Sequence, residues 1–363
     1  MNNMNPLTLL IKPAAGLCNM NCSYCFYRSA SEARENRIMT NDTVDVLIQR
    51  IKEYQPSALS VMFQGGEPTL AGIDYYQYFI DRVQENLSVP VQYALQTNGL
   101  LIDEAYAAFF QKNGFLIGLS LDGNRKTNDR YRRDRNGSSV LPQILHAAAI
   151  LKKYQVDFNI LSVIDDENAA EIASTWNYFK KHGFDYLQFI PYVDEGNGVS
   201  LSAEAYGAFL KKVFDLWYAD YRNGNYISVR HIDNYIGILL GRPPENCAMC
   251  GVCGSYYVVE ANGDLYPCDF YCQDAYRVGS LYDERPFAIG ETHQAFIEES
   301  RLIHSHCSDC EYHFICRGGC KKDRCNGFSE NKYCKAYQDF FAYAGERMMR
   351  IAALLDEKQG SVV

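Results

Sequence analysis

The placement of the cysteines constrains this chain more than any other feature. The chain has 363 residues and 14 cysteines, of which three lie between Cys18 and Cys25 and eleven between Cys247 and Cys334. The start of the chain lacks the basic and apolar layout of a secretion signal, so we expect a reducing, cytoplasmic compartment. Clustered cysteines in such a compartment usually bind metal or take part in catalysis. The distribution therefore predicts two metal-binding regions that flank a cysteine-free scaffold.

Composition narrows the class of protein. Hydrophobic residues make up 47% of the chain, enough for a sizeable core. No apolar run approaches the roughly 20 residues that a membrane span needs. The formal net charge of −9 argues against nucleic-acid binding, which depends on Lys and Arg neutralising phosphates. We expect a globular protein that binds neither a membrane nor nucleic acid.

The scaffold alternates short apolar runs with helix-like stretches, which predicts an α/β fold with a parallel sheet. A partial barrel and a doubly wound sheet both fit this alternation. Polar and glycine-rich residues follow the strands, and ligands bind at the carboxyl ends of parallel strands, so a partial (β/α)6 barrel, similar to a TIM barrel, is the simpler interpretation. The predicted strands are 8–11, 59–63, 91–95, 116–121, 158–164 and 186–190.

Helices are expected between these strands. Thr40, Asp74, Asp103 and Ser139 are predicted N-caps, and Gly114 and Gly183 lie where C-terminal glycines belong. The break at 241–244 (GRPP) is the best boundary. It divides the chain into a barrel with linking helices, residues 1–240, and a cysteine-rich domain with a C-terminal helix, residues 241–363. The predicted helices are 44–54, 75–86, 104–113, 141–154, 169–182 and 203–220.

Cys18, Cys22 and Cys25 form a CxxxCxxC motif directly after the first strand. A structural zinc site would use four protein ligands, usually Cys or His. The next cysteine is Cys247 and the first histidine is His146, so no fourth ligand is near. Three thiolates on a short loop suit a four-iron cluster that leaves one iron open.

With Phe26 after it, this motif resembles that of the radical S-adenosylmethionine superfamily. The resemblance implies that S-adenosylmethionine binds the open iron and is cleaved to a 5′-deoxyadenosyl radical. The glycine-rich segment 65–68 (GGEP) is similar to the superfamily segment that contacts the cofactor. For the residues at the other strand ends, capping of the strand is an equally good interpretation. The cofactor contacts implied by the resemblance are Gly65, Gly66, Glu67, Asn98, Ser120 and Asp122.

The second cysteine region begins with a predicted β-hairpin, residues 256–260 and 264–266. Spacing alone favours zinc and iron–sulfur about equally here. The order of spacings resembles the SPASM extension, an iron–sulfur domain with two auxiliary four-iron clusters. Cys250, Cys272 and Cys325 are then surplus, and the choice of Cys247 over Cys250 stays open. The implied ligand sets are Cys247, Cys253, Cys268 and Cys320, and Cys307, Cys310, Cys316 and Cys334.

Longer segments resemble the anaerobic sulfatase-maturating enzymes: 22–27 (CSYCFY), 63–72 (FQGGEPTLAG), 95–99 (LQTNG), 118–123 (GLSLDG), 266–271 (YPCDFY), 316–320 (CRGGC) and 333–340 (YCKAYQDF). This resemblance implies oxidation of a Cys, or Ser, of an unfolded or nascent sulfatase to formylglycine, within a Cys/Ser-x-Pro/Ala-x-Arg motif. It further implies an electron donor such as flavodoxin or ferredoxin, and a monomer.

By the same resemblance Asp269 is the base that removes the proton of the target residue, and Tyr24 and Gln64 contact that residue. A turn-capping role is the alternative for Asp269, and a core or solvent-facing position is the alternative for Tyr24 and Gln64. Two other functions stay open. One is a peptide maturase that forms thioether or carbon–carbon crosslinks, although a first strand near residue 8 leaves little room for the extra N-terminal domain that such enzymes often carry. The other is a non-catalytic zinc-binding adaptor.

Overall fold

The computed structural model describes residues 5–28, 34, 37–194, 196–324 and 330–360. The chain forms two compact units. Unit 1 comprises Met1–Leu121, Asp129–Phe158 and Gly254–Phe296, and unit 2 comprises Asp122–Asn128, Asn159–Cys253 and Ile297–Val363.

Unit 1 is built on four parallel strands, each paired with the next along the chain. Leu9 lies opposite Val61, and Val61 lies opposite Tyr93, so the apolar runs predicted as strands are in register with one another. These four predicted strands are confirmed. The strands are β1 (Leu7–Ile11), β2 (Leu59–Phe63), β3 (Val91–Thr97) and β4 (Phe115–Ser120).

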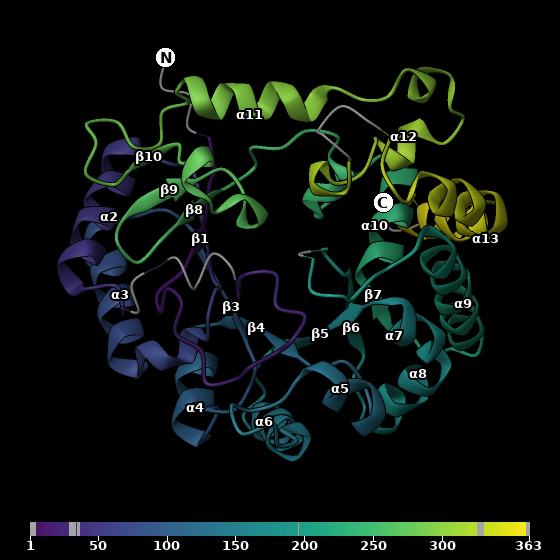
Figure 1. The fold of residues 1–363 in the computed structure, drawn as a ribbon, viewed down its shortest axis with the longest axis horizontal. Coiled ribbons are helices and arrows are strands. Elements are labelled where there is room, and N and C mark those ends of the chain that lie inside the picture. Colours follow the sequence, from purple (N-terminus) through teal and green to yellow (C-terminus); the bar gives the residue numbers. More distant parts are fainter. Residues whose placement is uncertain (1–4, 29–33, 35–36, 195, 325–329, 361–363) are drawn as a thin grey trace. The chain divides into compact units, whose positions relative to one another are not determined.

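The crossover helices of unit 1 lie along the outer side of this sheet (Figure 1). Their apolar faces and the inner strand residues form one core, in which the Phe63 ring lies 5.0 Å from Tyr76 and 5.2 Å from Phe79, both in edge-on contact. The helices are α2 (Asn41–Tyr54), α3 (Ile73–Asn86), α4 (Glu104–Lys112) and α6 (Leu141–Lys153).

Two of the four predicted N-caps are confirmed. The Thr40 side chain accepts a hydrogen bond from the backbone N–H of Thr43, and the Asp103 side chain accepts one from Tyr106. Each satisfies a backbone N–H of the first turn that has no partner within the helix.

Asp74 and Ser139 are not N-caps, so these two predictions are wrong. Helix α3 starts directly after Gly72, which places Asp74 inside the first turn, where a carboxylate suits the positive end of the helix dipole. Helix α6 has Val140 as its N-cap, yet the Ser139 hydroxyl still accepts a hydrogen bond from the backbone N–H of Leu141 at 3.4 Å.

The predicted hairpin is confirmed, and it extends the sheet of unit 1. Strands β8 (Tyr257–Val259) and β9 (Asp264–Tyr266) pair antiparallel, and β9 pairs with the short strand β10 (Gly279–Ser280). Strand β8 also pairs parallel with β1, with Ile11 opposite Val259. The turn of the hairpin, residues 260–263, therefore lies at the carboxyl end of β1, a position that the sequence pattern did not reveal.

Unit 2 contains the parallel strands β5 (Phe158–Ile164), β6 (Tyr186–Pro191) and β7 (Ser228–Val229). The first two confirm the fifth and sixth predicted strands, and with them the α/β fold on parallel strands. The single helix predicted over 169–182 is two helices, α7 (Asp166–Ala170) and α8 (Ile172–Lys181), because Glu171 ends one and caps the other.

Long helices pack against one another in unit 2. Helix α9 (Ala203–Arg222) contacts the C-terminal helix α13 (Cys334–Gly360), and a Cβ at Gly207 would lie 3.4 Å from Ala336, so a small residue allows the close approach.

The remaining helices of the described chain are α5 (Arg125–Tyr131), α10 (Arg230–Leu239), α11 (Glu291–Arg301) and α12 (His313–Cys316). Short 3₁₀ helices are η1 (Pro68–Ala71), η2 (Cys247–Met249), η3 (Asp269–Tyr271), η4 (Asp274–Tyr276), η5 (Ser305–Asp309) and η6 (Lys321–Asp323).

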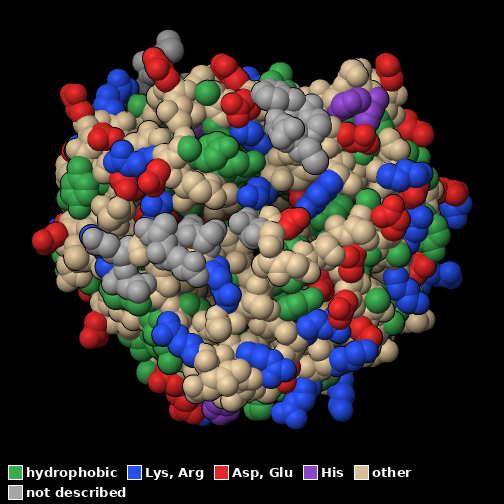
Figure 2. Space-filling model, in the orientation of Figure 1, with side chains coloured by type: hydrophobic (Ala, Val, Ile, Leu, Met, Phe, Trp, Pro, Cys, Tyr) green, Lys and Arg blue, Asp and Glu red, His purple; other side chains and the backbone are tan. Residues whose placement is uncertain are grey.

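The surface carries both signs of charge. Figure 2 shows acidic and basic side chains interspersed over the face in view, so the excess of acidic residues is not gathered into one patch there. In the part of the chain that the structure describes, no helix combines the length and the apolar character needed to cross a membrane.

Candidate functional site

The CxxxCxxC motif lies in the segment that follows β1, as predicted. The Cys18 thiol accepts a hydrogen bond from the backbone N–H of Met20, with an N···S distance of 3.4 Å. The Cys18 carbonyl accepts one from the Arg135 guanidinium at 2.6 Å. Burial raises the pKa of the thiols of Cys18 and Cys25. A metal that binds here must therefore displace protons that these thiols hold at neutral pH.

The two glycines after β2 meet steric demands that no other residue satisfies. Gly65 and Gly66 have φ values of 110° and 60°, the left-handed region. A Cβ at Gly66 would lie 2.3 Å from the Leu17 carbonyl oxygen, within the segment that leads into Cys18. The glycine segment thus packs directly on the backbone of the chain that leads into the three-cysteine segment.

Glu67 is the centre of a buried hydrogen-bond network. One carboxylate oxygen accepts from the hydroxyls of Thr69 and Thr97 at 2.6 and 2.7 Å, and the other from the backbone N–H of Asn98 at 2.8 Å. Burial raises the pKa of this carboxyl, and these hydrogen bonds oppose the effect. The network links the ends of β2 and β3. A further contact between Glu67 and the cofactor stays a prediction.

Asn98 and Ser120, predicted to lie at the same rim, are both buried at strand ends of unit 1. The Asn98 amide nitrogen donates to the Asn19 side chain at 2.7 Å, which ties the end of β3 to the three-cysteine segment. In unit 2, Asp122 is buried and accepts a hydrogen bond from the backbone N–H of Val163 at 2.9 Å. This contact is the strand-capping role that the sequence left as the alternative.

Asp269 and Gln64, which are 205 positions apart, are brought together. Gln64 donates through its amide nitrogen to one Asp269 carboxylate oxygen at 2.7 Å. Asp269 begins η3, directly after Cys268 and the β8–β9 hairpin, and is buried. Gln64 follows β2, and its backbone N–H donates to the Ile11 carbonyl. Pairing of β8 with β1 explains why these residues meet.

Lys12, which was not predicted from the sequence, completes this group. The Lys12 side chain is fully buried, and its ammonium donates to the other Asp269 carboxylate oxygen. We call Lys12, Gln64 and Asp269 the Asp269 cluster. Lys12 directly follows the first strand, so the rule that ligands gather at carboxyl ends of strands could have identified it.

Tyr24 lies between two of the predicted cluster ligands and is buried. Its hydroxyl accepts a hydrogen bond from the Arg132 guanidinium at 2.9 Å, and its ring lies 5.3 Å from that of Tyr131. Arg132, itself buried, was also missed, because it lies in a segment without a recognisable motif. Contact of Tyr24 with a target residue stays a prediction.

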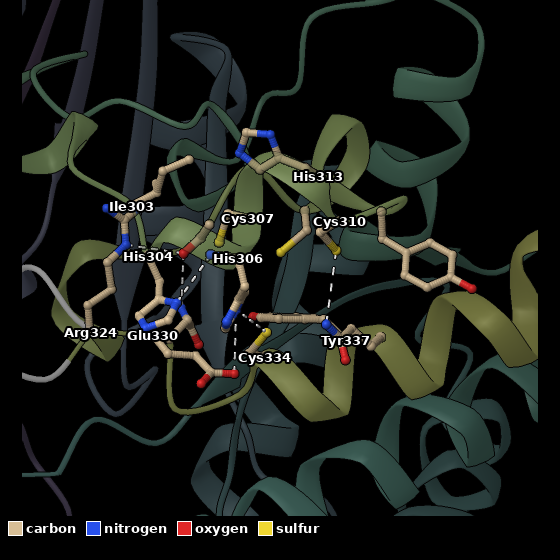
Figure 3. Close-up of a pocket in the computed structure, with 15 residues that line it drawn as sticks. Ile303, His304, His306, Cys307, Cys310, His313, Arg324, Glu330, Cys334 and Tyr337 are labelled. Atoms are coloured by element: carbon tan, nitrogen blue, oxygen red, sulfur yellow. Dashed lines mark hydrogen bonds and ion pairs between the residues drawn. The ribbon is translucent and has the colours of Figure 1, made fainter.

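In unit 2, one predicted ligand set lines a single pocket (Figure 3). We call it the cysteine pocket; it is lined by Cys307, Cys310, Cys316 and Cys334, although 27 positions separate the first from the last. Burial raises the pKa of Cys316 to about 11 and that of Cys334 to about 12. Four thiols around one pocket are the donor set of an iron–sulfur cluster or a zinc ion.

The glycines of the CRGGC segment let the chain turn beside this pocket. Gly318 and Gly319 have positive φ values, and a Cβ at Gly319 would lie 2.5 Å from the Asn331 amide nitrogen. The buried Arg324 guanidinium donates to the carbonyl oxygens of both glycines. Backbone geometry and this arginine thus hold Cys316 and Cys320 on a fixed loop.

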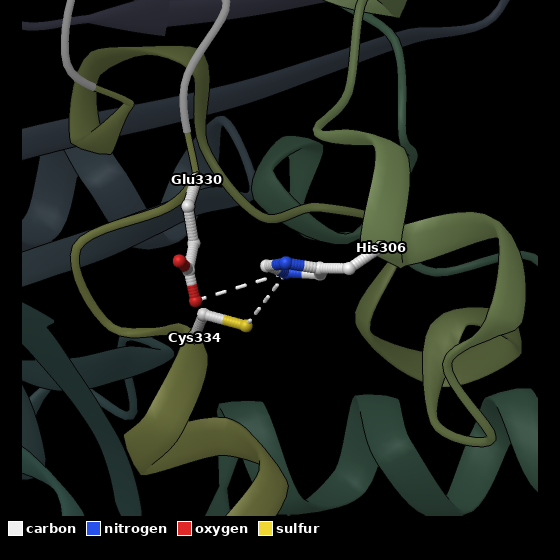
Figure 4. Close-up of side chains that lie close together, drawn as sticks. All are labelled: His306, Glu330 and Cys334. Carbon is white, nitrogen blue, oxygen red and sulfur yellow. Dashed lines mark hydrogen bonds and ion pairs between the residues drawn. The ribbon is translucent and has the colours of Figure 1, made fainter.

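His306 and Glu330, neither of which was predicted from the sequence, lie beside Cys334. The His306 Nε2 atom is 3.6 Å from the Cys334 sulfur and 3.7 Å from a Glu330 carboxylate oxygen (Figure 4). Among the described residues, these three form the one group of possible metal ligands with all donor atoms within 4.8 Å of one another. A histidine directly before the first cysteine of a CxxC pair was the available signal.

The other predicted ligand set is divided between the units. Cys247, Cys253 and Cys320 belong to unit 2, and Cys268 belongs to unit 1. Burial raises the pKa of Cys247 and Cys253. Cys268 accepts a hydrogen bond from the Tyr256 hydroxyl at 3.5 Å.

Two surplus cysteines direct their thiols to backbone carbonyls. The Cys250 sulfur lies 3.6 Å from the Asn246 carbonyl oxygen, and the Cys272 sulfur 3.6 Å from that of Cys268. The third surplus cysteine, Cys325, lies outside the described residues. The contact of Cys250 does not decide whether Cys247 or Cys250 is a ligand, so Cys247 as a ligand stays a prediction.

Comparison with known proteins adds to this geometry. Residues 14–179 match the radical SAM superfamily. A cysteine-type anaerobic sulfatase-maturating enzyme of Clostridium perfringens (strain 13 / Type A) is 38% identical to this chain, and the match covers 96% of this chain and 99% of the relative. A serine-type anaerobic sulfatase-maturating enzyme of Klebsiella aerogenes is 32% identical over 93% of this chain and 85% of the relative.

A solved structure is similar over nearly the whole chain. Native anSMEcpe with bound AdoMet and Cp18Cys peptide has a TM-score of 0.91 and a sequence identity of 36%, with 96% of this chain and 99% of that chain covered. The similarity therefore extends through both units.

Proposed function

Because this chain belongs to the family of anaerobic sulfatase-maturating enzymes, within the radical SAM superfamily, we propose that it oxidises a cysteine of a sulfatase polypeptide to formylglycine. The observation that carries the proposal is the Asp269 cluster. A buried carboxylate is held by Gln64 and Lys12 at the carboxyl end of β1, the strand that leads into the three-cysteine segment. A carboxylate in that position is suited to accept the proton that the target thiol must lose.

Three four-iron clusters and S-adenosylmethionine are the proposed cofactors. The thiols fit as ligands, because thiolates are the usual ligands of such clusters. When bound, S-adenosylmethionine and its cluster supply the radical that removes a hydrogen atom from the target Cβ, and an auxiliary cluster takes up one further electron. The proposed ligands are Cys18, Cys22 and Cys25 for the first cluster; Cys247, Cys253, Cys268 and Cys320 for the second; and Cys307, Cys310, Cys316 and Cys334 for the third.

The protein residues have separate proposed roles. Asp269 accepts the thiol proton, so that a hydrogen atom, a proton and an electron leave the CH2–SH group in total and the thioaldehyde CH=S remains. Water then converts the thioaldehyde to the aldehyde and releases hydrogen sulfide. Tyr24 and Gln64 orient the target side chain. The residues proposed to contact S-adenosylmethionine are Gly65, Gly66, Glu67, Asn98, Ser120 and Asp122.

The proposed substrate is an unfolded or nascent sulfatase segment with a Cys/Ser-x-Pro/Ala-x-Arg motif. The bound peptide in the similar structure and the names of the relatives support a peptide substrate. Cysteine is the first choice of target, because the cysteine-type relative is 38% identical and the serine-type relative 32%. We further propose a monomer that works in the cytoplasm with flavodoxin or ferredoxin as electron donor. The proposed domains are a radical SAM partial barrel with linking helices, residues 1–240, and a SPASM domain with a C-terminal helix, residues 241–363.

Mass spectrometry of a Cys-x-Pro-x-Arg peptide tests the proposal. After anaerobic incubation with reduced, reconstituted enzyme and S-adenosylmethionine, we expect the mass of the aldehyde product and its reaction with a carbonyl reagent. The matched peptides carry Ser or Ala in place of Cys, and the Ala peptide should stay unchanged. A product that has lost hydrogen only, with no reactive aldehyde, would instead indicate a crosslinking maturase.

A further inference from the structure

Lys12 is a fully buried lysine, and the proposed function gives it no role in the reaction beyond its contact with Asp269. A lysine ammonium is rarely buried unless it is paired, because removal from water disfavours the charge. The position directly after β1, beside the proposed base, raises the question of what this charge does.

The contacts of Lys12 hold its side chain in one place. The ammonium donates to Asp269 and lies 3.8 Å from the centre of the Tyr27 ring, the distance of a cation–π contact. A Cβ at Gly65 would lie 2.7 Å from the Lys12 Cγ atom and 2.8 Å from its nitrogen. The glycine segment therefore packs directly against the lysine, and no larger residue fits between them.

The surrounding charges keep Lys12 protonated. Burial alone would lower the pKa of the ammonium, but the negative charges of Asp269 and Glu260 outweigh burial and raise it. Glu260 is buried and accepts a hydrogen bond from the Tyr27 hydroxyl at 2.8 Å, so it is itself fixed. Lys12 therefore brings a permanent positive charge to this region of the protein.

The two donors fix the Asp269 carboxylate from two sides. Lys12 holds one oxygen and Gln64 holds the other at 2.7 Å. The donors come from the ends of neighbouring parallel strands, β1 and β2, so their spacing is set by the sheet. With both oxygens held, rotation of the carboxylate would break a charge-assisted hydrogen bond.

We propose that Lys12 is a positioning residue, which acts through Asp269 by holding its carboxylate where the target thiol delivers its proton. This inference rests on the proposed function of Asp269. Lys12 itself need not touch the substrate or the cofactor. Displacement of a reacting group by about 1 Å can lower a rate about 100-fold, so a loss of this size is expected when the lysine is removed.

The test measures two products of the reconstituted enzyme. In Lys12→Met, aldehyde formation should fall about 100-fold, whereas 5′-deoxyadenosine formation, iron content and the KM for the peptide stay close to wild-type values. Lys180→Met is the matched control, because Lys180 also pairs with a largely buried aspartate, Asp220, and both residues belong to unit 2. It should change neither product.

A double variant keeps the test decisive if Lys12→Met, which leaves an uncompensated buried carboxylate, fails to fold. Lys12→Met with Asp269→Asn contains neither charge. If Lys12 acts through Asp269, the double variant matches Asp269→Asn in both products. A further loss of aldehyde in the double variant, or a parallel loss of both products and of iron in Lys12→Met, would overturn the inference. Absence of aldehyde with wild-type enzyme would instead refute the proposed function.

Discussion

The Asp269 cluster of unit 1 and the cysteine pocket of unit 2 stabilise their buried polar groups differently. In the Asp269 cluster, the carboxylate meets an ammonium and an amide from the protein itself. In the cysteine pocket, burial raises the pKa of Cys316 and Cys334 to about 11 and 12, so their thiolates need a cation to form at neutral pH. Folding alone pairs the carboxylate of the first site, whereas the second site would gain a charge partner for its thiolates from the cluster that we propose there.

Removal of the first three cysteines should have the largest effect. It shows how much of each product forms when S-adenosylmethionine cannot be cleaved. With Cys18, Cys22 and Cys25 replaced by Ala, we expect no 5′-deoxyadenosine and no aldehyde, because S-adenosylmethionine then has no iron to bind. Chromatography of the reaction mixture measures the first product. Replacement of the surplus Cys272 by Ala is the control, and persistent cofactor cleavage in the triple variant would show that the motif is misassigned.

Asp269→Asn should give the next largest effect and separates the two chemical steps. Loss of general-base catalysis typically lowers a rate by about 10²- to 10⁴-fold, so aldehyde formation should fall by this factor while cofactor cleavage continues. The ratio of 5′-deoxyadenosine to aldehyde is the measurement. An unchanged ratio would remove Asp269 from the role of base.

Cys307→Ala with Cys316→Ala breaks the cysteine pocket and leaves the Asp269 cluster intact. Iron should fall from about twelve to about eight atoms per chain, since one four-iron cluster is lost. Cofactor cleavage should continue. Iron and zinc analysis of anaerobically reconstituted protein checks this outcome, and a pocket that holds zinc and no iron would contradict the third cluster.

Glu67→Gln should have the smallest of these effects. It tests whether the hydrogen bonds to Glu67 stabilise the fold when no metal is bound. The amide replaces one acceptor oxygen by a donor, so the hydrogen bonds from Thr69 and Thr97, or the one from Asn98, are lost. We expect a loss of about 1–3 kcal/mol in the free energy of unfolding. Denaturant unfolding of the metal-free protein measures it. Glu284→Gln, at an exposed position of unit 1, is the matched control, and equal stability of both variants would refute a structural role for Glu67.

Much of the scaffold could be predicted because its signals are local. Six parallel strands, the hairpin after Cys253 and the caps Thr40 and Asp103 follow from apolar runs, turn residues and first-turn chemistry. The predicted helix boundaries were wrong where contacts with other residues determine where a helix begins or ends. Glu171 divides a helix predicted as continuous, and α3 begins at Ile73 rather than after Asp74.

The site could be predicted in part. Spacing and resemblance identified the four thiols that line the cysteine pocket, and motif position identified Gln64 and Asp269. Lys12 and Arg132 lie outside any motif and were missed. The position of Lys12 after the first strand was a usable signal, but its partner Asp269 lies 257 positions away, and Tyr24, the partner of Arg132, lies 108 positions away. No local pattern identifies partners so far apart.

The sequence by itself determined the α/β scaffold, the two cysteine regions and the glycine-rich segment that contains Gly65 and Gly66. The tertiary structure alone decided that β8 pairs with β1 and thereby brings Lys12 to Asp269 across 257 positions. A strand as short as β8 can form backbone hydrogen bonds with any free sheet edge. Its partner is therefore selected by long-range burial and charge pairing, which no local pattern encodes.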